Sequence, residues 1–307
     1  MSNRYVLITP CRNEAEFARR TLDSVCAQTI PPALWVIVDD GSTDETPSIL
    51  AEYAAKFGFI RIVRREDRGK RAVGPGVIEA FYAGLDMVDL GQFDFLCKLD
   101  LDLDLPLNYF ESLMARMHSN PRLGTCSGKP YYVDPKTGEL ISEGCGDDTS
   151  IGASKFYRVT CFQQNGGFVR QVMWDGIDCH RCRINGWIAC SWDDPEIRFI
   201  HLRPMGSSQQ NILVGRMRWG FGQYFMGTGP LYMAASAVFR MKKRPYVIGG
   251  LCMMWGYVRS WLRRETRYED ESFRKFLRRY QWRCLVHGKK KAMEMTDAEQ
   301  ASAFQPN

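Results

Sequence analysis

Residues 93–102 read Phe-Asp-Phe-Leu-Cys-Lys-Leu-Asp-Leu-Asp, and this stretch decides the fold class. A short, mostly apolar run that is bounded by polar residues is typical of a buried strand. We therefore expect a strand over Phe93–Leu99. Two carboxylates, Asp100 and Asp102, follow it directly, so both are expected at the carboxyl end of that strand.

The first hundred residues repeat this pattern, with apolar runs that alternate with amphipathic stretches. Strands are expected at Tyr5–Thr9, Leu34–Val38 and Phe59–Val63, with helices between them at Glu14–Ala27, Thr46–Lys56 and Pro75–Met87. This β-α-β-α-β-α-β order predicts an α/β fold with a mostly parallel, doubly wound sheet. Ligands of such sheets bind beyond the carboxyl ends of the strands, where this chain is unusually polar.

Length and composition exclude a disordered chain, because 307 residues with 45% hydrophobic side chains can bury a full core. The net charge of +6 would suit phosphorylated ligands, anionic lipid or nucleic acid. The stretch from Arg198 onward is dense in Arg and Lys, including Lys242-Lys243-Arg244, so the basic end is expected to face an anionic surface. Nucleic acid is not an expected partner, since the acidic edge would repel its phosphates and no nucleic-acid-binding module is recognisable.

Eleven cysteines are scattered without framework spacing, and no secretory signal precedes the first expected strand. This usage predicts a reducing cytoplasm. Cys179-x-x-Cys182, with His180 and Cys190 nearby, loosely resembles a zinc site, but the second pair of ligands is missing. Zinc is therefore not expected, and His180 is expected to be an exposed helix residue.

The texture of the chain changes after about Leu202. Trp219–Phe239 contains no charged residue, and Tyr246–Val258 is a second apolar run; both lie between basic flanks. Their glycines and weak hydrophobicity favour segments at a membrane interface over a bilayer span. A buried helical hairpin in a soluble protein is the alternative. We predict a first domain over 1–210 and a C-terminal amphipathic, basic helical region over 211–307, peripheral at the inner face of the plasma membrane.

Asp100-x-Asp102 places two carboxylates at one strand terminus, where a divalent cation could hold them together. Mg²⁺ or Mn²⁺ takes oxygen ligands and keeps positions open for substrate phosphates. An acidic turn after a strand is otherwise a common solvated loop. Asp104 could be a third ligand or a helix N-cap before Pro106, and the cap is favoured.

Asp39-Asp40-Gly41-Ser42-x-Asp44 combines a turn glycine with carboxylates at another strand end. That geometry suits an acceptor for the imide N–H of a pyrimidine, while Asp44 or Ser42 caps the helix at Thr46. Further on, Lys70 and Arg71 occupy a glycine-broken basic segment. They could reach phosphate oxygens or sugar hydroxyls of a bound donor, although a solvated charge run describes them equally well.

Three motifs in this order and spacing resemble glycosyltransferase family 2: strand-Thr-Pro-Cys-Arg-Asn-Glu, Val-Asp-Asp-Gly-Ser-Thr-Asp and strand-Asp-x-Asp. The resemblance covers about residues 5–206. It implies a GT-A fold, inversion at the anomeric carbon, a nucleobase read by Asp40, a Thr9–Arg12 turn along that base, and Asp102 as the more direct metal ligand. The nucleotide-binding residues then expected are Thr9, Pro10, Arg12, Glu14, Asp40, Lys70, Arg71 and Asp100. Many relatives carry an aromatic residue where this chain has Arg12, whose guanidinium could stack on the base instead.

An inverting transfer needs one general base, opposite the departing diphosphate, to take the proton from the attacking hydroxyl. The family draws it from an acidic motif that opens a helix ending in glycine. Asp175 lies eleven residues before Gly186 (186 minus 175), which resembles that spacing, although Trp174-Asp175 replaces the usual Glu-Asp pair. Asp175 is our first candidate. Asp178 is the second, one helical turn on and expected on the same face, and helix N-capping is the alternative for either.

Some relatives place a metal- or phosphate-binding histidine where His201 follows the strand-like Arg198–Ile200. A neutral imidazole there could complete a metal site, and a strand-end histidine bonded to backbone is the alternative. Lys70, Arg71 or Arg203 would help to neutralise the leaving diphosphate. The family resemblance thus implies a metal-dependent inverting glycosyltransferase that moves a sugar from a nucleotide-diphosphate donor, a UDP-sugar, onto a glycan or lipid-linked acceptor in surface polysaccharide synthesis. The alternative is a non-catalytic relative that binds nucleotide-sugar or glycan.

Overall fold

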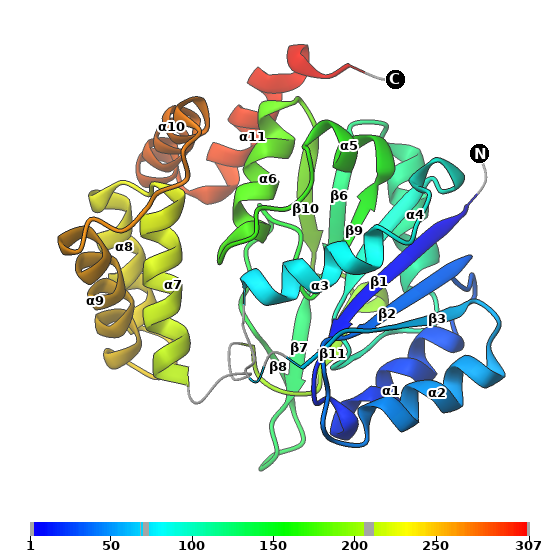
Figure 1. The fold of residues 1–307 in the computed structure, drawn as a ribbon. Helices are drawn as coiled ribbons and strands as arrows, with labels where there is room; N and C mark the ends of the chain where they lie inside the picture. The colour runs from blue at the N-terminus through cyan, green and yellow to red at the C-terminus, as the bar shows by residue number, and fades with distance from the viewer. Residues whose placement is uncertain (1–2, 68, 70–73, 206–211, 306–307) are drawn as a thin grey trace.

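The computed structural model describes residues 3–67, 69, 74–205 and 212–305, and it places a large sheet between two layers of helices, with further helices at one side (Figure 1). The strand order of this sheet is β10-β6-β9-β4-β1-β2-β3. Its strands are β1 (Tyr5–Cys11), β2 (Leu34–Asp39), β3 (Ile60–Arg64), β4 (Phe95–Leu99), β6 (Leu123–Gly128), β9 (Ser154–Arg158) and β10 (Ile188–Trp192). Within the described residues β9 runs antiparallel to β4 and β6, and the other neighbours pair in parallel. The predicted mostly parallel sheet is therefore confirmed.

Alternating side chains of β1 show how both faces of the sheet are covered. Tyr5 and Leu7 belong to one buried cluster, whereas Val6 and Ile8 belong to another, as the two-residue period of a strand requires. The first face is covered by α1 (Ala15–Cys26), α2 (Thr46–Lys56) and α4 (Tyr109–Ser119), and the second by α3 (Pro75–Leu85), α5 (Val159–Gln164) and α6 (Trp174–Ile184). The sheet is thus doubly wound, as predicted.

The first strand is longer than the sequence indicated. Parallel pairing of β1 with β2 continues to Cys11, which lies opposite Asp39. Thr9 and Pro10 are therefore buried within the strand, and the prediction of a turn over these residues is wrong. The Thr9 hydroxyl accepts a hydrogen bond from the Trp35 indole N–H at 2.9 Å, which directs it into the protein.

A second, smaller sheet begins with the strand that follows β4 in the chain. Its order is β5-β11-β7-β8, with β5 at Leu103–Asp104, β11 at Phe199–His201, β7 at Pro130–Val133 and β8 at Leu140–Ser142. His201 pairs with Leu103 and Ile200 with Asp104. The favoured N-cap role of Asp104 is wrong, because this pairing keeps Asp104 extended and its carboxylate lies 2.7 Å from Arg20.

Five helices follow in the C-terminal part that the structure describes: α7 (Ile212–Met226), α8 (Pro230–Met241), α9 (Ile248–Leu262), α10 (Glu271–His287) and α11 (Lys289–Glu299). Single 3₁₀ turns occur at Leu90–Gln92, Pro195–Ile197 and Gln300–Ala303. Helices α7 and α9 pack closely through glycine: a Cβ on Gly220 would lie 2.0 Å from the Met253 carbonyl oxygen. Among the described residues, no helix is long and apolar enough to cross a membrane.

The last helices return to the first part of the chain. Asp297 of α11 lies 3.0 Å from the buried Arg183 of α6, and the Tyr280 hydroxyl of α10 donates to Asp148 at 3.0 Å. The boundary between 210 and 211 stays a prediction. The first contact joins α11 to α6, which carries both candidates for the general base, and the second joins α10 to the segment between β8 and β9.

His180 corrects another expectation. It is 7% exposed and its ring lies against Phe273, Phe276 and Tyr280 of α10. The expected exposed helix position is wrong, because a helix almost a hundred residues later in the chain covers this face of α6. Burial, reinforced by the charge of Arg183, lowers the pKa of the His180 imidazole to about 3.

Candidate active site

The carboxyl ends of β1, β2 and β4 meet at one edge of the large sheet. Cys11 lies opposite Asp39 in the β1–β2 pair, and Ile8 lies opposite Lys98 in the β1–β4 pair. The Arg12 guanidinium connects the first two loops, since it donates to the Asp40 carbonyl oxygen at 2.8 Å. The polar segments that the sequence singled out after these strands therefore lie together.

In the loop after β2, the carboxylates of Asp39 and Asp40 each have a hydrogen-bond or ion-pair partner. Asp39 accepts from the Ser42 amide at 2.8 Å, and Asp40 lies 2.7 Å from Arg65. The Arg12 guanidinium also pairs with Asp67, so it is held at the edge of this loop. Arg65 and Asp67 were missed from the sequence, because nothing in their spacing separates them from a solvated charge run.

Asp44 fulfils the predicted capping role. Its carboxylate accepts from the amide of Thr46, the first residue of α2, at 2.9 Å, and from the amide of Ala15, the first residue of α1, at 3.1 Å. Burial opposes its ionisation, but these hydrogen bonds outweigh it and lower the pKa of Asp44. One carboxylate thus ties the amino ends of two helices to the loop.

Asp102 is 3% exposed at the end of the β4 segment. Its Oδ2 lies 2.6 Å from Arg203 Nε and 3.6 Å from His201 Nε2. Desolvation works against the charge, but these two cations lower the pKa of Asp102 to about 2. Its Oδ1 is buried without a hydrogen-bond partner among the described residues, which leaves one anionic acceptor unused.

Asp100 lies beside it in a different environment. It is partly exposed and paired with the Lys98 ammonium. Partial burial raises the pKa of Asp100 above its ordinary value, against the attraction of Lys98. A cation bound between Asp100 and Asp102 would favour the charged form of both carboxylates.

His201 stands at the end of β11, as the sequence predicted, but its partners are carboxylates. Its Nδ1 lies 3.0 Å from Glu143, and Asp102 flanks the other nitrogen. Burial lowers the basicity of the ring, but the two carboxylates outweigh it and raise the pKa of His201 to about 10. These carboxylates favour the protonated imidazole when no metal ion is bound, and His201 as a neutral metal ligand stays a prediction. Glu143 was missed, because its approach depends on the β7–β8 hairpin.

Arg203 links Asp102 to Glu14, whose Oε1 it contacts at 2.7 Å. Glu14 is buried and lies at the same edge, as predicted. Its connection to Asp102 runs through Arg203, which comes much later in the chain. Lys70 and Arg71, the remaining expected phosphate-binding residues, lie outside the described residues.

The residues at this edge fit a hard divalent cation. Asp100 and Asp102 offer carboxylate oxygens one residue apart, and the Oδ1 of Asp102 lacks a partner in the described structure. Mg²⁺ and Mn²⁺ prefer oxygen ligands and share their shell with substrate phosphates. Within the described residues, no group of three or more His, Cys, Asp or Glu side chains that could hold a metal ion is found.

Asp175 lies in the first turn of α6, next to this edge. A Cβ on Gly152 would lie 3.1 Å from Asp175 Oδ2. The Gly152 carbonyl oxygen accepts from Lys98 at 2.9 Å, and Lys98 pairs with Asp100. The Lys98 ammonium also lies 5.3 Å from the centre of the Trp174 ring. The structure therefore connects the candidate base to the paired acids through Gly152 and Lys98.

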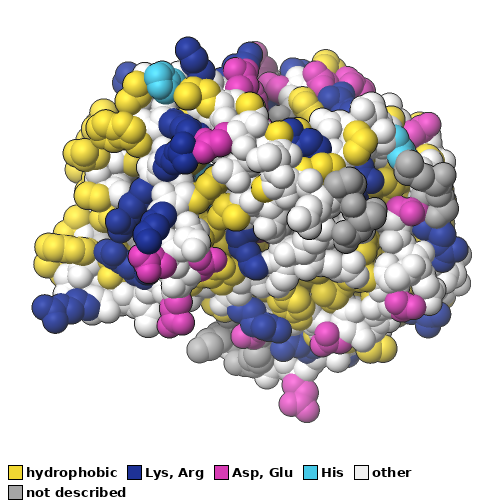
Figure 2. Space-filling model, turned by 90° about the horizontal axis from the view of Figure 1, so that it is seen from above, with side chains coloured by type: hydrophobic (Ala, Val, Ile, Leu, Met, Phe, Trp, Pro, Cys, Tyr) yellow, Lys and Arg dark blue, Asp and Glu magenta, His cyan; other side chains and the backbone are white. Residues whose placement is uncertain are grey.

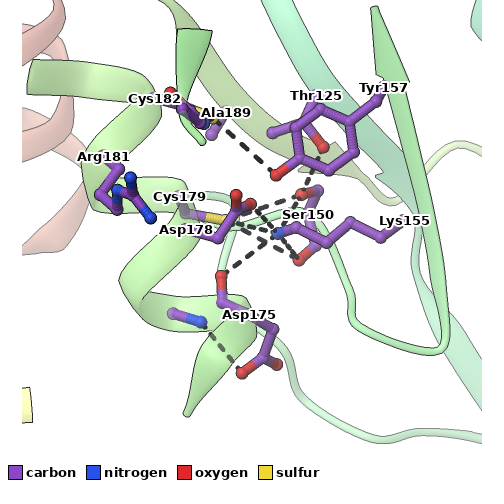
Figure 3. A network of polar contacts seen from close by, with 12 residues as sticks. Thr125, Ser150, Lys155, Tyr157, Asp175, Asp178, Cys179, Arg181, Cys182 and Ala189 are labelled. Carbon is purple, nitrogen blue, oxygen red and sulfur yellow. Dashed lines mark hydrogen bonds and ion pairs between the residues drawn. The ribbon is translucent and has the colours of Figure 1, made fainter. Parts of the chain in front are cut away.

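Asp178 does not share the position of Asp175. In Figure 3 its carboxylate points toward Lys155, whereas the Asp175 carboxylate points away from that lysine. Asp178 is 1% exposed and lies 3.1 Å from the Lys155 ammonium. Burial raises the pKa of Asp178 to about 6. The two carboxylates therefore have different partners: Asp178 pairs with Lys155 of β9, whereas Asp175 lies beside Gly152.

The cysteines of α6 have separate partners. Cys179 receives a hydrogen bond from Lys155 at 3.0 Å, and Cys182 receives one from the Asn165 amide at 2.8 Å. Their thiols therefore belong to the buried polar contacts of α6.

Part of the chain is similar in sequence to known proteins. Residues 6–143 match the family model described as glycosyl transferase family 2. A poly-beta-1,6-N-acetyl-D-glucosamine synthase of Staphylococcus epidermidis is 30% identical over 121 residues, which cover 39% of this chain and 27% of that protein. The chain therefore matches little more than a quarter of the length of this curated relative.

Solved structures resemble the chain over nearly its whole length. S. aureus TarS 1–349 in complex with UDP-GlcNAc has a TM-score of 0.54 at 14% identity, covering 98% of this chain and 91% of the other. The mannosyltransferase PcManGT of Pyrobaculum calidifontis in complex with GDP-Man and Mn²⁺ has a TM-score of 0.52 at 14% identity, covering 97% and 87%. At such identities the likeness concerns the fold alone.

Proposed function

Since residues 6–143 form a glycosyltransferase family 2 domain within a GT-A fold, we propose that this chain is an inverting glycosyltransferase. It transfers a sugar from a nucleotide-diphosphate donor, preferably a UDP-sugar, to a glycan acceptor. One observation carries the proposal: Asp175 lies beside Gly152, whose carbonyl oxygen accepts from Lys98, and Lys98 pairs with Asp100. A general base and a pair of acidic ligands are thus available to one bound donor and acceptor.

In this proposal Asp175 takes the proton from the attacking hydroxyl of the acceptor. The Asp100 and Asp102 carboxylates would hold Mg²⁺ or Mn²⁺, which would neutralise charge on the diphosphate when bound. Arg203, anchored by Glu14 and Asp102, adds positive charge beside the same position. No covalent intermediate is needed, because a single displacement with one base accounts for inversion.

Asp40 is proposed to accept the imide N–H of uracil. Arg65 and the loop after β2 fix the position of its carboxylate, so a base could be recognised without much rearrangement. A thymine base offers the same N–H. The relative TarS, whose structure holds UDP-GlcNAc, supports the choice of a uridine donor.

Calorimetric titration of the purified protein with a panel of nucleoside diphosphates, with and without Mn²⁺, tests the donor site. We expect binding of UDP or dTDP that depends on Mn²⁺ and is lost in Asp40→Ala. Binding without sugar transfer to any acceptor would favour the non-catalytic relative, which the Trp174-Asp175 pair in place of Glu-Asp supports. A folded protein that binds none of these diphosphates would contradict the proposal.

We further propose that the acceptor is a lipid-linked glycan of surface polysaccharide synthesis, and that the protein contacts the inner face of the plasma membrane peripherally. The support is an apolar surface on two neighbouring helices. Exposed side chains recur at helical spacing on one face of each helix: Leu231, Val238 and Phe239 on α8, and Ile248, Leu251, Trp255 and Leu262 on α9. We call this set the α8–α9 surface.

Charge around the α8–α9 surface indicates its partner. No Asp or Glu occurs between Ile197 and Arg264, whereas Lys242, Arg244, Arg259 and Arg263 do. Figure 2 shows apolar side chains along the left edge of the molecule, where α8 and α9 lie in Figure 1, with Lys and Arg side chains near them. A second copy of the chain would bring two cationic rims together, whereas an anionic bilayer would be attracted to them.

Vesicle sedimentation at low salt tests this contact. We expect binding to vesicles that contain phosphatidylglycerol, weak binding to purely zwitterionic ones, and loss of binding in Leu251→Glu/Trp255→Glu. Leu140→Glu, which changes an exposed apolar side chain of β8, is the matched control and should bind like the wild type. Membrane contact through the α8–α9 surface would be contradicted if both variants sedimented equally with the vesicles. It would also be contradicted if the wild type formed a dimer that the double variant does not form.

A further inference from the structure

Lys155 of β9 is a buried cation that the proposed mechanism does not use. Its side chain is 0% exposed, and its strand neighbour two residues on, Tyr157, belongs to the apolar cluster between the sheet and α6. The two-residue period of a strand therefore puts Lys155 at a position where an apolar side chain would be expected. An ammonium is costly to bury unless several partners replace its water.

The partners of Lys155 lie on two segments (Figure 3). Ser150 Oγ accepts from the ammonium at 2.8 Å, and Asp178 and Cys179 of α6 lie 3.1 and 3.0 Å from it. The Ser150 carbonyl oxygen accepts at 3.4 Å, and the main-chain carbonyl oxygen of Asp175 accepts at 3.2 Å. Lys155 thus binds the backbone of the same residue whose carboxylate faces Gly152.

A simple ion pair with Asp178 would not require the contact with Asp175. Carbonyl groups in the first turn of a helix already accept hydrogen bonds from amides one turn on. The Asp175 carbonyl therefore does not need the additional bond from Lys155, and this bond serves to restrain the turn. On its other side, the Asp175 carboxylate accepts from the Gly176 amide at 2.9 Å. Both ends of Asp175 are therefore fixed, the main chain by Lys155 and the carboxylate by its own helix.

We propose that Lys155 is a positioning residue for the general base: it anchors the first turn of α6 through the Asp175 carbonyl oxygen, and Asp178 serves as its buried counter-ion. The inference rests on the proposed function of Asp175. It also gives Asp178 a role that differs from proton transfer, since its carboxylate holds the ammonium in place from one helical turn further along.

The test replaces the buried pair without leaving a single charge behind. Lys155→Met/Asp178→Leu substitutes apolar side chains of similar size, an exchange that buried ion pairs often tolerate. We expect unchanged affinity for UDP and an unchanged KM for the donor, with kcat lower by about tenfold or more, because a base displaced by a fraction of an ångström loses its alignment. Asp178→Asn alone keeps Lys155 but removes its counter-ion, so we expect a smaller loss of kcat than in the double variant.

Hydrogen exchange supplies a readout that does not depend on turnover. The Ile177 amide, which bonds to the Met173 carbonyl oxygen at 2.9 Å, should exchange faster in the double variant while the amides of β1 and β2 stay protected. If the double variant does not fold, Lys155→Gln/Asp178→Asn replaces it, with the same expectations, because the amide is one bond shorter and loses its reach to Asp175.

The outcomes separate the two proposals. A folded double variant with wild-type kcat and wild-type exchange at Ile177 would overturn the positioning role and leave a structural ion pair. Faster exchange in the variant, in a protein whose wild type transfers no sugar, would support the anchoring of the first turn of α6 by Lys155 and contradict the proposed transfer. A lower kcat with unchanged donor affinity and faster exchange is the result that we expect.

Discussion

The proposed site has a donor half, with Asp40, Asp100 and Asp102, and an acceptor half, with Asp175. The two halves differ in which parts of the chain hold them. In the donor half, the carboxylates after β2 bind partners at most 29 positions away, from Ser42 to Arg65 and Ala15, whereas Asp102 after β4 binds Arg203. In the acceptor half, the turn that carries Asp175 is held by β9 and by helices of the C-terminal region. The family match ends at residue 143, before the acceptor half begins. The matched residues therefore include the carboxylates of the proposed donor half but neither Asp175 nor Arg203.

The largest effect that would sharpen this comparison is expected at Asp102. Asp102→Asn removes the charge of the unpartnered Oδ1 and should lower kcat/KM by about 100-fold or more, with loss of Mn²⁺-dependent UDP binding in calorimetry. Asp104→Asn is the matched control, because Asp104 is an acidic neighbour that pairs with the exposed Arg20. The account of the donor half fails if both variants behave alike.

His180 gives the acceptor half a pH dependence that the donor half does not share. Its pKa is about 3 in the folded protein and close to 6.5 when unfolded, so the unfolded chain takes up the proton first as the pH falls. Stability from this residue is full above about pH 6.5 and is lost toward pH 3, by about 2 kcal/mol at pH 5. Denaturant unfolding of wild type and His180→Phe between pH 7 and pH 5 measures the difference.

Phenylalanine suits this position, since three aromatic rings surround His180 and its Nδ1 has no hydrogen-bond partner among the described residues. The variant should lose less stability than the wild type as the pH falls. Parallel curves for the two proteins would mean that His180 does not carry the acid sensitivity of the α6–α10 contact.

A smaller effect is expected where α7 meets the start of α6. Met173, which precedes α6, has a left-handed backbone with a φ of 64°, and a Cβ on Gly222 would lie 2.3 Å from Met173 Cγ. Gly222→Ala should therefore displace the first turn of α6 and lower kcat by about tenfold, with UDP affinity unchanged. Steady-state kinetics together with calorimetry would separate these two quantities.

Gly249→Ala in α9 is the control for that substitution. Its added Cβ would meet Pro245 only at 3.5 Å, and alanine is favoured over glycine within a helix by about 1 kcal/mol. The control should keep kcat and gain stability. Equal kcat in Gly222→Ala and Gly249→Ala would show that α7 does not influence the acceptor half.

Local signals account for what the sequence predicted. Pro and Gly breakers and the spacing of apolar residues placed the helix at Thr46–Lys56 within its observed bounds and the strands of the first hundred residues within about two residues. The capping role of Asp44 followed from the same local rules. These features depend on neighbours a few residues away, which a single sequence displays.

Long-range pairing accounts for what the sequence did not predict. Asp104 is extended because β11, almost a hundred residues later, pairs with it. Asp178 is buried because β9 places a lysine against α6, and Glu143 reaches His201 only through the small sheet. No periodicity or motif within one segment encodes such contacts, so they emerged only from the fold.

The most direct test of the central claim compares Asp175→Asn with Asp178→Asn in sugar transfer at saturating donor, measured as UDP release in the presence of acceptor. Both carboxylates lie on one helix, but only Asp175 adjoins the edge that holds Asp100. We expect Asp175→Asn to lose about 100-fold or more in kcat with unchanged UDP affinity, and Asp178→Asn, which removes only the counter-ion of Lys155, to lose less than about tenfold. A greater loss in Asp178→Asn, or full activity in Asp175→Asn, would contradict the account.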